Sequence, residues 1–519
     1  MALAMRRRNL VSAACPFWPA QTAALLLACG ISLLFASTAS AFQLGTRWSS
    51  TATGSTGSVG SPVKLTWSFA PNGTSVPQPH QGTSSLITFL DTQFGAGPGG
   101  TDLTKRPWYS SFSQSFDRWS QLSGATFTYE PNDNGAQFQS SVGSIGIRGD
   151  IRIAGENIDS AGNTLALTTP PDFGDILIDT SDGSYFSAGA PSHLGFRNTI
   201  MYELGHSLGL LHVVSSTNDF LMEPNISLGF DGPQIDDILG VQSLYGDVYE
   251  KSNNGQGNDT AAHATPLGAI AIGGTKSIGT SPAAVAGRMP PLVQPTDTDF
   301  ISIDNSTDTD FYSFTTSGAA RLSVMLTPQG GSYMQGPESG GQSTFNAAAQ
   351  SDLALAIYST DGTTQLALSN SAPAGQPEIR SNLALPAAGQ YYVRVTGAAS
   401  TVQLYDLQLS IAASFLTGDY NHNGKVDAAD YLIWRNMVGK TGLALAADGS
   451  GNGIVDSADY GLWKANFGTA AGNGAGSDTV AGGTVPEPAT AFLLAIGGTL
   501  AILARHLRQK PFLAANFSQ

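Results

Sequence analysis

Cysteine is nearly absent from this chain. The 519 residues include only two cysteines, Cys15 and Cys29, and both lie within the first 41 residues. Those residues have the composition of a segment that is cleaved off, so the chain that remains contains no cysteine. Disulfide bonds are therefore excluded as a source of its stability.

Charge is also scarce, and positive charge most of all. Charged residues make up 12% of the chain, with 39 acidic against 24 basic side chains and a formal net charge of −15. Because no basic patch lies outside the termini, the balance argues against nucleic acid as a partner. The length predicts about three domains. The many small and polar residues, including 61 glycines, suit exported β-rich modules.

Residues 1–41 have the features of a secretory signal. Residues 6–8 are three arginines, residues 23–35 form an apolar run, and Ala-Ser-Ala at 39–41 is a small-residue cleavage site. Lipoprotein-type cleavage before Cys29 is the alternative, but the apolar run continues beyond that residue. We therefore expect an exported protein.

The most informative stretch is residues 202–212, Tyr-Glu-Leu-Gly-His-Ser-Leu-Gly-Leu-Leu-His. Glu203 and His206 lie on a predicted helix whose apolar residues Ile200, Leu204 and Leu208 would face the core.

His206 and His212 would point in different directions on an unbroken helix. Gly209 lies between them, and glycine readily adopts the left-handed conformation that ends a helix and turns the chain. With that turn, the two imidazoles could converge on one metal ion beside Glu203.

This stretch matches the zinc-protease pattern H-E-x-x-H-x-x-G-x-x-H at every position but the first, where Tyr202 stands. The chain here resembles the metzincins, and specifically the matrixin family. Two later segments extend the resemblance. Residues 220–224, Phe-Leu-Met-Glu-Pro, resemble the Met-turn, and residues 234–246 resemble the closing helix of matrixin catalytic domains.

The resemblance implies an α/β metzincin domain and a secreted, zinc-dependent metalloendopeptidase that acts on protein or peptide substrates. His206 and His212 would be zinc ligands, Glu203 the general base, Gly209 the turn and Met222 the floor of the site. A zinc-activated water would attack the peptide bond without a covalent intermediate.

Tyr202 occupies the position of the first zinc ligand and leaves three alternatives open. The phenol could ligate zinc as a phenolate and support reduced proteolysis. Another residue could complete the site, and His193 is the only nearby histidine. Otherwise zinc binds weakly or not at all and the protease is degenerate. The competing function is then a catalytically inactive, calcium-dependent surface adhesion or scaffold protein.

Two further features of the matrixin resemblance are missing. Leu167 and Leu177 occupy positions where the family supplies histidines to a structural zinc, so we expect only one zinc. The cysteine switch that holds many matrixins latent is also absent, so we expect no conventional inhibitory propeptide.

The domain that resembles a matrixin is placed at residues 42–250. Hydrophobic alternation and helical spacing predict a set of elements that together make an α/β sheet with covering helices. The expected strands are 63–69, 126–129, 145–148, 150–153 and 174–179, and a helix is expected over 113–122.

Residues 251–412 resemble a bacterial pre-peptidase C-terminal domain. The resemblance rests on residues 258–268, 308–314, 351–358 and 389–395. Strict alternation between glycine- and proline-rich turns predicts an all-β, antiparallel sandwich without a catalytic constellation. Residues 251–259 are expected to be a polar linker, and the insert at 328–350 a mobile loop.

Residues 413–470 contain a duplicated acidic loop, and its second copy begins 29 residues after the first. The spacing of the oxygen-bearing side chains matches a calcium-binding loop of the EF-hand kind, and each loop leads into a helix. The predicted ligands are Asp419, Asn421, Asn423, Lys425, Asp427 and Asp430, and Asp448, Ser450, Asn452, Ile454, Asp456 and Asp459. The pair resembles a small α-helical type I dockerin, which implies two calcium ions and a cohesin-like partner.

The C-terminal part begins with a Gly/Ala linker at 471–484. Residues 485–510 then combine Val-Pro-Glu-Pro, a short apolar stretch and a basic end. They resemble a PEP-CTERM sorting signal, and a tail anchor is the alternative. We expect a multidomain bacterial protein, secreted to the exterior or held at the cell envelope or surface. Contact with a membrane is expected only through this terminal helix.

Overall fold

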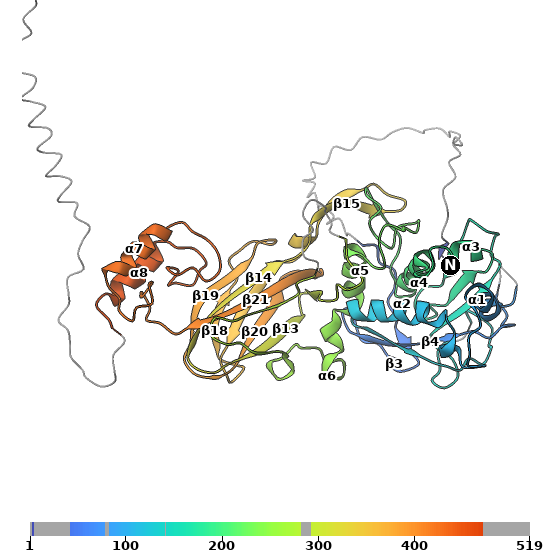
Figure 1. Ribbon diagram of the computed structural model, residues 1–519, viewed down its shortest axis with the longest axis horizontal. Coiled ribbons are helices and arrows are strands. Elements are labelled where there is room, and N and C mark those ends of the chain that lie inside the picture. Colours follow the sequence, from blue (N-terminus) through green and yellow to red (C-terminus); the bar gives the residue numbers. More distant parts are fainter. Residues whose placement is uncertain (1–2, 5–41, 78–81, 141, 282–291, 471–519) are drawn as a thin grey trace, which may run out of the picture. The chain divides into compact units, whose positions relative to one another are not determined.

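The computed structural model describes residues 3–4, 42–77, 82–140, 142–281 and 292–470 (Figure 1). Nearly all of the predicted secretory signal and the whole predicted sorting segment lie outside these ranges. The chain divides into two compact units, one ending at Ala413 and the next beginning at Ser414. In the described ranges, no helix combines the length and apolar character needed to cross a membrane.

A mixed β-sheet frames the N-terminal part of the first unit. Its strand order, among described residues, is β1-β7-β8-β6-β4-β5. β4 pairs in parallel with β5 and β6, and β6 with β8, whereas β7 runs antiparallel to β8. The strands are β1 (Leu3–Ala4), β4 (Val63–Phe69), β5 (Ala125–Tyr129), β6 (Ile151–Glu156), β7 (Ala166–Thr168) and β8 (Ile176–Asp179). A separate two-stranded ribbon pairs β2 (Ser50–Thr51) with β3 (Gly54–Ser55).

The strand predicted at 145–148 is wrong. These residues form a tight turn closed by a bridge between Ser144 and Arg148. Gly146 has a φ of +77°, which breaks an extended strand, and the side chains of Ile145 and Ile147 are 64% and 44% exposed. Two apolar residues in alternation therefore gave a strand pattern without a buried face.

Helices cover the sheet and bury the apolar centre of this part. They are α1 (Leu86–Phe94), α2 (Tyr109–Leu122), α3 (Gly183–Phe186), α4 (Leu194–Ser207) and α5 (Ile235–Tyr245), with a 3-10 turn, η1 (Leu103–Lys105). The helix expected at 113–122 is the C-terminal part of α2. Phe116 of α2 stacks on Trp67 of β4 with ring centroids 4.3 Å apart. Trp119 donates from its indole nitrogen to the Met201 carbonyl at 2.8 Å and so ties α2 to α4.

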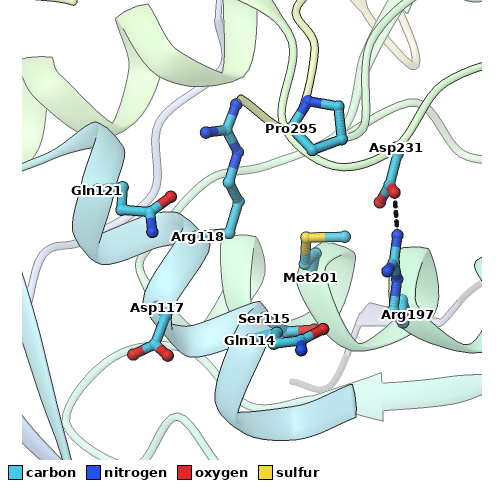
Figure 2. Close-up of a pocket in the computed structure, with 9 residues that line it drawn as sticks. All are labelled: Gln114, Ser115, Asp117, Arg118, Gln121, Arg197, Met201, Asp231 and Pro295. Carbon is cyan, nitrogen blue, oxygen red and sulfur yellow. Dashed lines mark hydrogen bonds and ion pairs between the residues drawn. The ribbon is translucent and has the colours of Figure 1, made fainter. Parts of the chain in front are cut away.

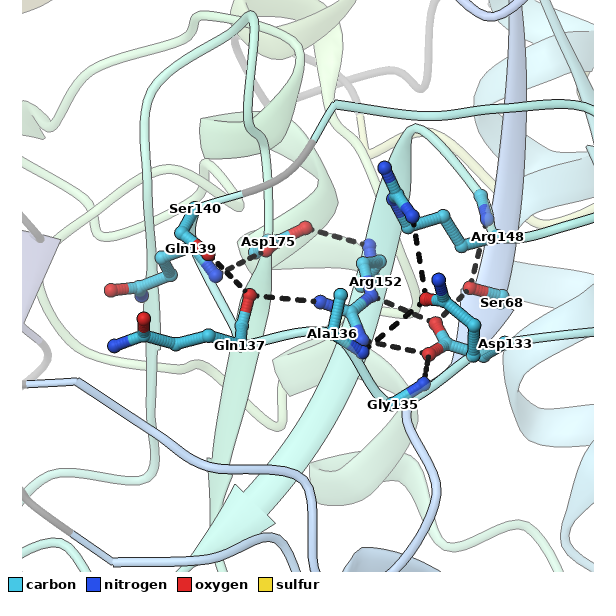
Figure 3. A network of polar contacts seen from close by, with 12 residues as sticks. Ser68, Asp133, Gly135, Ala136, Gln137, Gln139, Ser140, Arg148, Arg152 and Asp175 are labelled. Atoms are coloured by element: carbon cyan, nitrogen blue, oxygen red, sulfur yellow. Dashed lines mark hydrogen bonds and ion pairs between the residues drawn. The ribbon is translucent and has the colours of Figure 1, made fainter.

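A buried ion pair fixes the loop that follows β5 (Figure 3). Arg152 on β6 is fully buried, and its guanidinium donates to both carboxylate oxygens of Asp133 at 2.7 and 2.8 Å. Asp175 accepts the backbone N–H of Arg152, and burial raises the pKa of Asp175 to about 7. Such a pair specifies geometry more than it adds stability, because both charges lose their hydration.

The rest of the first unit is a β-sandwich of two sheets, ordered β10-β13-β20-β17-β18 and β11-β21-β14-β19, with β12 beside β21. Most pairs are antiparallel, as the alternation predicts, but β10 and β13 pair in parallel. The strands are β10 (Thr265–Ala269), β11 (Thr275–Ile278), β12 (Ile301–Ile303), β13 (Thr309–Thr316), β14 (Ala320–Pro328), β17 (Leu353–Tyr358), β18 (Gln365–Ser369), β19 (Glu378–Leu385), β20 (Gly389–Gly397) and β21 (Gln403–Ala413).

The segment expected to be a polar linker is packed instead. It contains the end of η2 (Val248–Lys251) and α6 (Ser252–Gly255), and η3 (Ala261–His263) follows it. Lys251 donates to carbonyl oxygens of Ser120 and Ala125, and Asn258 is fully buried. A polar composition therefore reflects internal hydrogen bonding here rather than a free connector.

The insert expected to be a mobile loop is a β-ribbon. β15 (Ser332–Pro337) pairs with β16 (Ser343–Asn346), followed by η4 (Ala347–Ala349). β15 also pairs with β9 (Val213–Ser215), which directly follows His212. Tyr333 and Phe345 of the ribbon are buried in the same core as α4, because alternate ribbon residues face that core.

The described part of the second unit, residues 414–470, contains α7 (Ala428–Met437) and α8 (Ser457–Asn466), each preceded by one acidic loop. The duplication is visible in its hydrogen bonds. Trp434 donates to the Asp456 carbonyl at 2.7 Å, and its counterpart Trp463 donates to the Asp427 carbonyl at 2.8 Å. Each helix thereby holds the end of the other copy's loop.

Candidate metal centre

Helix α4 is buried on nearly all sides, so its polar residues lie inside the domain. Glu203 and His206 are 1% and 5% exposed, and Tyr202 is 1% exposed. The carbonyls at the end of the helix are satisfied, because Trp48 donates to Ser207 and Tyr245 to Leu208. A buried helix that carries a carboxylate and an imidazole is costly unless those groups have partners or a function.

Gly209 turns the chain back after α4. Its φ is +101°, and Leu210 donates its N–H to the Gly205 carbonyl at 2.9 Å. The turn brings His212 to His206, with the two ring centroids 5.0 Å apart. The two histidines of the motif therefore lie together.

Met222 lies beneath α4. A Cβ added at Gly205 would meet the Met222 sulfur at 2.4 Å, so the helix backbone rests directly on this side chain. Asp237 of α5 holds the segment in place by accepting the backbone N–H groups of Leu221 and Met222 at 2.8 and 3.0 Å. The role of Asp237 was not apparent from the sequence.

Two buried polar atoms at the site have no hydrogen-bond partner among the residues that the structure describes. His206 donates a hydrogen bond from its Nδ1–H to the Leu210 carbonyl at 2.7 Å. Its Nε2 therefore carries a buried lone pair. Glu203 accepts from the Thr168 hydroxyl at 2.6 Å through Oε2, and its Oε1 is unpartnered. Burial lowers the pKa of His206 to about 3 and raises the pKa of Glu203 to about 8. A neutral imidazole beside a carboxyl oxygen fits the ligand chemistry of zinc.

Tyr202 contacts His212 directly. The phenol oxygen lies 2.6 Å from Nε2 of His212. Burial, with the nearby charges of Glu203 and Glu338, raises the pKa of Tyr202 well above its usual value. The phenol therefore keeps its proton, and its O–H donates a hydrogen bond to Nε2 of His212. The Tyr202 ring lies beside both imidazoles, with its centroid 4.7 Å from that of His206 and 5.9 Å from that of His212.

His193 does not complete the site. It immediately precedes α4, where its ring packs on Phe94 and its Nδ1 lies 3.1 Å from the Ser187 carbonyl. Thirteen positions of helix separate it from His206, which corresponds to about 20 Å along the axis. The alternative in which His193 supplies the missing ligand is therefore wrong.

A carboxylate from the β-ribbon also reaches the site. Glu338 follows β15, and its Oε2 lies 2.6 Å from Nδ1 of His212. Since 126 residues separate the two positions, no local spacing in the sequence could have indicated this contact.

Leu167 and Leu177 are directly paired across β7 and β8. Both are buried in a small apolar cluster with Val76 and Phe138. The positions that resemble histidine positions of a structural zinc thus contribute to packing.

An acidic cluster lies where the β-sandwich meets the N-terminal part. Carboxylate oxygens of Glu250, Asp259 and Asp308 lie within 4.8 Å of one another. Burial and the surrounding carboxylates raise the pKa of Glu250 to about 10 and the pKa of Asp308 well above its usual value. Because Asp308 is far from Glu250 and Asp259 in the sequence, no local spacing indicates the cluster.

Glu250→Gln is expected to stabilise the chain at alkaline pH. Because the folded-state pKa of Glu250 is raised, its stability contribution is lost as pH rises from about 4.5 towards about 10. With EDTA present, the variant should exceed the parent in free energy of unfolding by about 1–3 kcal/mol at pH 9 and by little at pH 4. Denaturant titrations at both pH values measure this.

Asp361→Asn is the matched control, because Asp361 is exposed and hydrogen bonds from Thr364 lower its pKa to about 2. That variant should show no gain at pH 9. An equal gain at both pH values for Glu250→Gln would contradict the electrostatic cause.

A cavity of about 220 Å³ lies on the outer faces of α2 and α4 (Figure 2). Arg118 borders it and donates to the carbonyls of Gln294 and Asp297, while Arg197 pairs with Asp231. None of the residues that the motif singles out lines it, so we assign it no part in the chemistry.

In the second unit, each acidic loop is closed by its own carboxylates. Asp419 accepts the N–H groups of Asn423 and Gly424, and Asp430 accepts those of Asn421 and Asp427. The second loop repeats this pattern through two aspartates, Asp448 and Asp459. In each loop, the side chains of the first and last predicted ligands therefore both accept hydrogen bonds from backbone N–H groups of that same loop.

Comparison with known protein families gives matches for two parts of the chain. Residues 97–246 match the model of the Matrixin family, and residues 308–397 match that of the Bacterial pre-peptidase C-terminal domain. The chain thus contains a matrixin-type α/β domain and a pre-peptidase C-terminal β-sandwich.

Several relatives match a part of this chain. Metalloendoproteinase 2-MMP of Arabidopsis thaliana is 31% identical over 145 residues, 26% of this chain and 36% of that protein. The Hatching enzyme of Paracentrotus lividus is 30% identical over 182 residues, 34% of this chain and 29% of that protein. Stromelysin-2 of Rattus norvegicus is 32% identical over 152 residues, 28% of this chain and 30% of that protein. The matches thus span about a third of each relative.

Among the similar solved structures is the pre-peptidase C-terminal domain of a collagenase from Bacillus anthracis. The match has 14% sequence identity and a TM-score of 0.16, and it covers 28% of this chain and 95% of the chain in that structure.

Proposed function

We propose that the chain is a zinc-dependent endopeptidase of the matrixin type that hydrolyses protein or peptide substrates. The observation that carries the proposal is the pair of buried, unpartnered atoms, His206 Nε2 and Glu203 Oε1, at a site that His212 also enters. His206 and His212 would hold the metal, and Tyr202 would join them as a phenolate.

The residues of the chain have separate roles in this proposal. Zinc, when bound, supplies an acidified water and polarises the scissile carbonyl. Glu203 takes the proton of the attacking water and passes it to the leaving nitrogen. Thr168 binds the other oxygen of Glu203, which leaves Oε1 free for this work. Gly209 provides the turn and Met222 the floor.

Chelator-sensitive cleavage of casein or gelatin by the full chain tests the proposal. The full chain is required because β15 pairs with β9, so a fragment ending at residue 250 would lack part of its fold. We expect cleavage that is lost with a chelator and restored by zinc. Tyr202→His should increase the rate, because imidazole binds zinc without first losing a proton at high pKa. A parent without any cleavage would overturn the proposal.

A second function is favoured by one specific observation. The Tyr202 hydroxyl occupies the His212 Nε2 lone pair at 2.6 Å, as in a site closed to metal. The chain would then be an inactive, calcium-dependent surface adhesion or scaffold protein. Cleavage by Tyr202→His, with none by the parent, would favour this alternative.

We further propose that the second unit is a dockerin-like module that binds two calcium ions through the two acidic loops and docks on a cohesin-like protein. The support is the loop duplication and the reciprocal bonds of Trp434 and Trp463. Export through a cleaved N-terminal signal, and sorting at the envelope of a bacterium through residues 485–510, complete the proposal.

A further inference from the structure

The β-ribbon from the sandwich meets the candidate metal centre in strict register. Pro337 pairs with Val213, Gly336 with Val214 and Gln335 with Ser215 in an antiparallel ladder. Glu338 directly follows Pro337, and His212 directly precedes Val213. The two residues therefore lie just beyond the last pair of the ladder. The ladder itself therefore brings the carboxylate to the imidazole.

The ribbon is fixed to the N-terminal part and is not a loose surface contact. The Tyr333 hydroxyl donates to Asp236 of α5 at 2.9 Å, and its ring packs on Phe220 at 5.1 Å between centroids. Tyr333 and Phe345 share the core that contains Met222. Burial of these aromatic side chains holds the ribbon, and with it Glu338, in place.

Hydrogen-bond chemistry then assigns the protons of His212. An ionised carboxylate can only accept, so the contact of 2.6 Å with Glu338 requires the proton on Nδ1. In the neutral ring, Nε2 consequently carries a lone pair, which accepts the Tyr202 hydroxyl at 2.6 Å. Glu338 thus sets which nitrogen faces the site.

The second histidine presents the same nitrogen by a different means. The Nδ1–H of His206 donates a hydrogen bond to the Leu210 carbonyl, and Nε2 faces the site. His206 is oriented by its own backbone turn, whereas His212 is oriented by a side chain from the β-sandwich. The two imidazoles therefore offer equivalent lone pairs only when the ribbon is in place.

We propose that Glu338 is a positioning residue of the metal centre, through which the β-sandwich fixes the tautomer and the direction of His212. This inference rests on the proposed function for the identity of the metal. Carboxylates that accept the second ring proton of a ligating histidine typically account for about 10- to 100-fold in metal affinity.

The test compares Glu338→Ala and Glu338→Gln with Ser339→Ala, a control at an exposed position of the same ribbon. Zinc affinity of the full chain is measured by competition with a chelator. We expect about a 10- to 100-fold loss for Glu338→Ala, and a smaller loss for Glu338→Gln because an amide oxygen still accepts. Ser339→Ala should match the parent. Unchanged affinity in Glu338→Ala would overturn the proposal.

A second measurement needs no metal. The ¹⁵N shifts of the histidine side chains in the metal-free full chain report which ring nitrogen carries the proton, and His212→Asn assigns the resonance. The parent should show His212 protonated at Nδ1 alone, and Glu338→Ala should show a tautomer mixture. A proton on Nε2 in the parent would overturn the proposal. If the parent binds no zinc, the proposed function fails, and these shifts still decide whether Glu338 sets the tautomer.

Discussion

Replacing Glu203 by glutamine is expected to lower the rate of peptide hydrolysis about 10²- to 10⁴-fold. The amide keeps the size of the side chain, and its oxygen can still accept the Thr168 hydroxyl bond of 2.6 Å. It cannot take a proton from the attacking water. Because Glu203 is fully buried within α4, no solvent base can readily replace it. Rates on casein, measured at equal zinc occupancy, give the comparison.

Glu223→Gln is the matched control for that experiment. Glu223 is likewise buried, bonded to a serine hydroxyl, and has a pKa raised by burial to about 7, but its partner is Ser215 rather than a group of the metal centre. It should retain the parent rate within about threefold, because a buried carboxyl as such does not catalyse. If Glu203→Gln kept more than a tenth of the parent rate, another group would be the base.

Gly209→Ala is expected to destabilise the first unit by at least about 3 kcal/mol. A Cβ at this position would lie 2.2 Å from the Thr46 carbonyl oxygen, and the φ of +101° is strained for any residue with a side chain. The neighbouring segment cannot move away easily, because Gly45 donates its N–H to the Gly209 carbonyl at 2.8 Å. The same change should weaken zinc binding, since the turn places His212.

Gly318→Ala serves as the control for backbone entropy. A Cβ there meets nothing within 4 Å, and its backbone is not in the left-handed region. Its free energy of unfolding should stay within about 0.5 kcal/mol of the parent. Equal stability of Gly209→Ala and the parent in denaturant titrations would show that the turn tolerates a side chain, against the geometry described.

The sequence predicted those parts of the site that depend on local spacing. Helical periodicity places Glu203 and His206 on one helix. The glycine that follows the helix permits only a few backbone paths to His212, so the position of His212 was also predictable. The strands with a buried face, such as Val63–Phe69, were also predictable.

The parts that could not be predicted depend on long-range packing. Glu338 reaches His212 only because a ribbon of the sandwich pairs with β9, and its glycine- and serine-rich composition reads as a loop. Asp237 and the cluster around Glu250 likewise act across segments that are distant in sequence. The turn at 145–148 shows the opposite failure, where local alternation had no buried face to support it.

Equilibrium zinc binding by the full chain shows whether residues 202–212 form a metal site. We predict one zinc bound at the matrixin-type site, lost in His206→Ala and in His212→Ala, and retained in Glu203→Gln. An X-ray absorption spectrum of the bound zinc should show two imidazole ligands. A chain that binds no zinc, or a double variant without His206 and His212 that binds zinc as well as the parent, would show that these histidines form no zinc site.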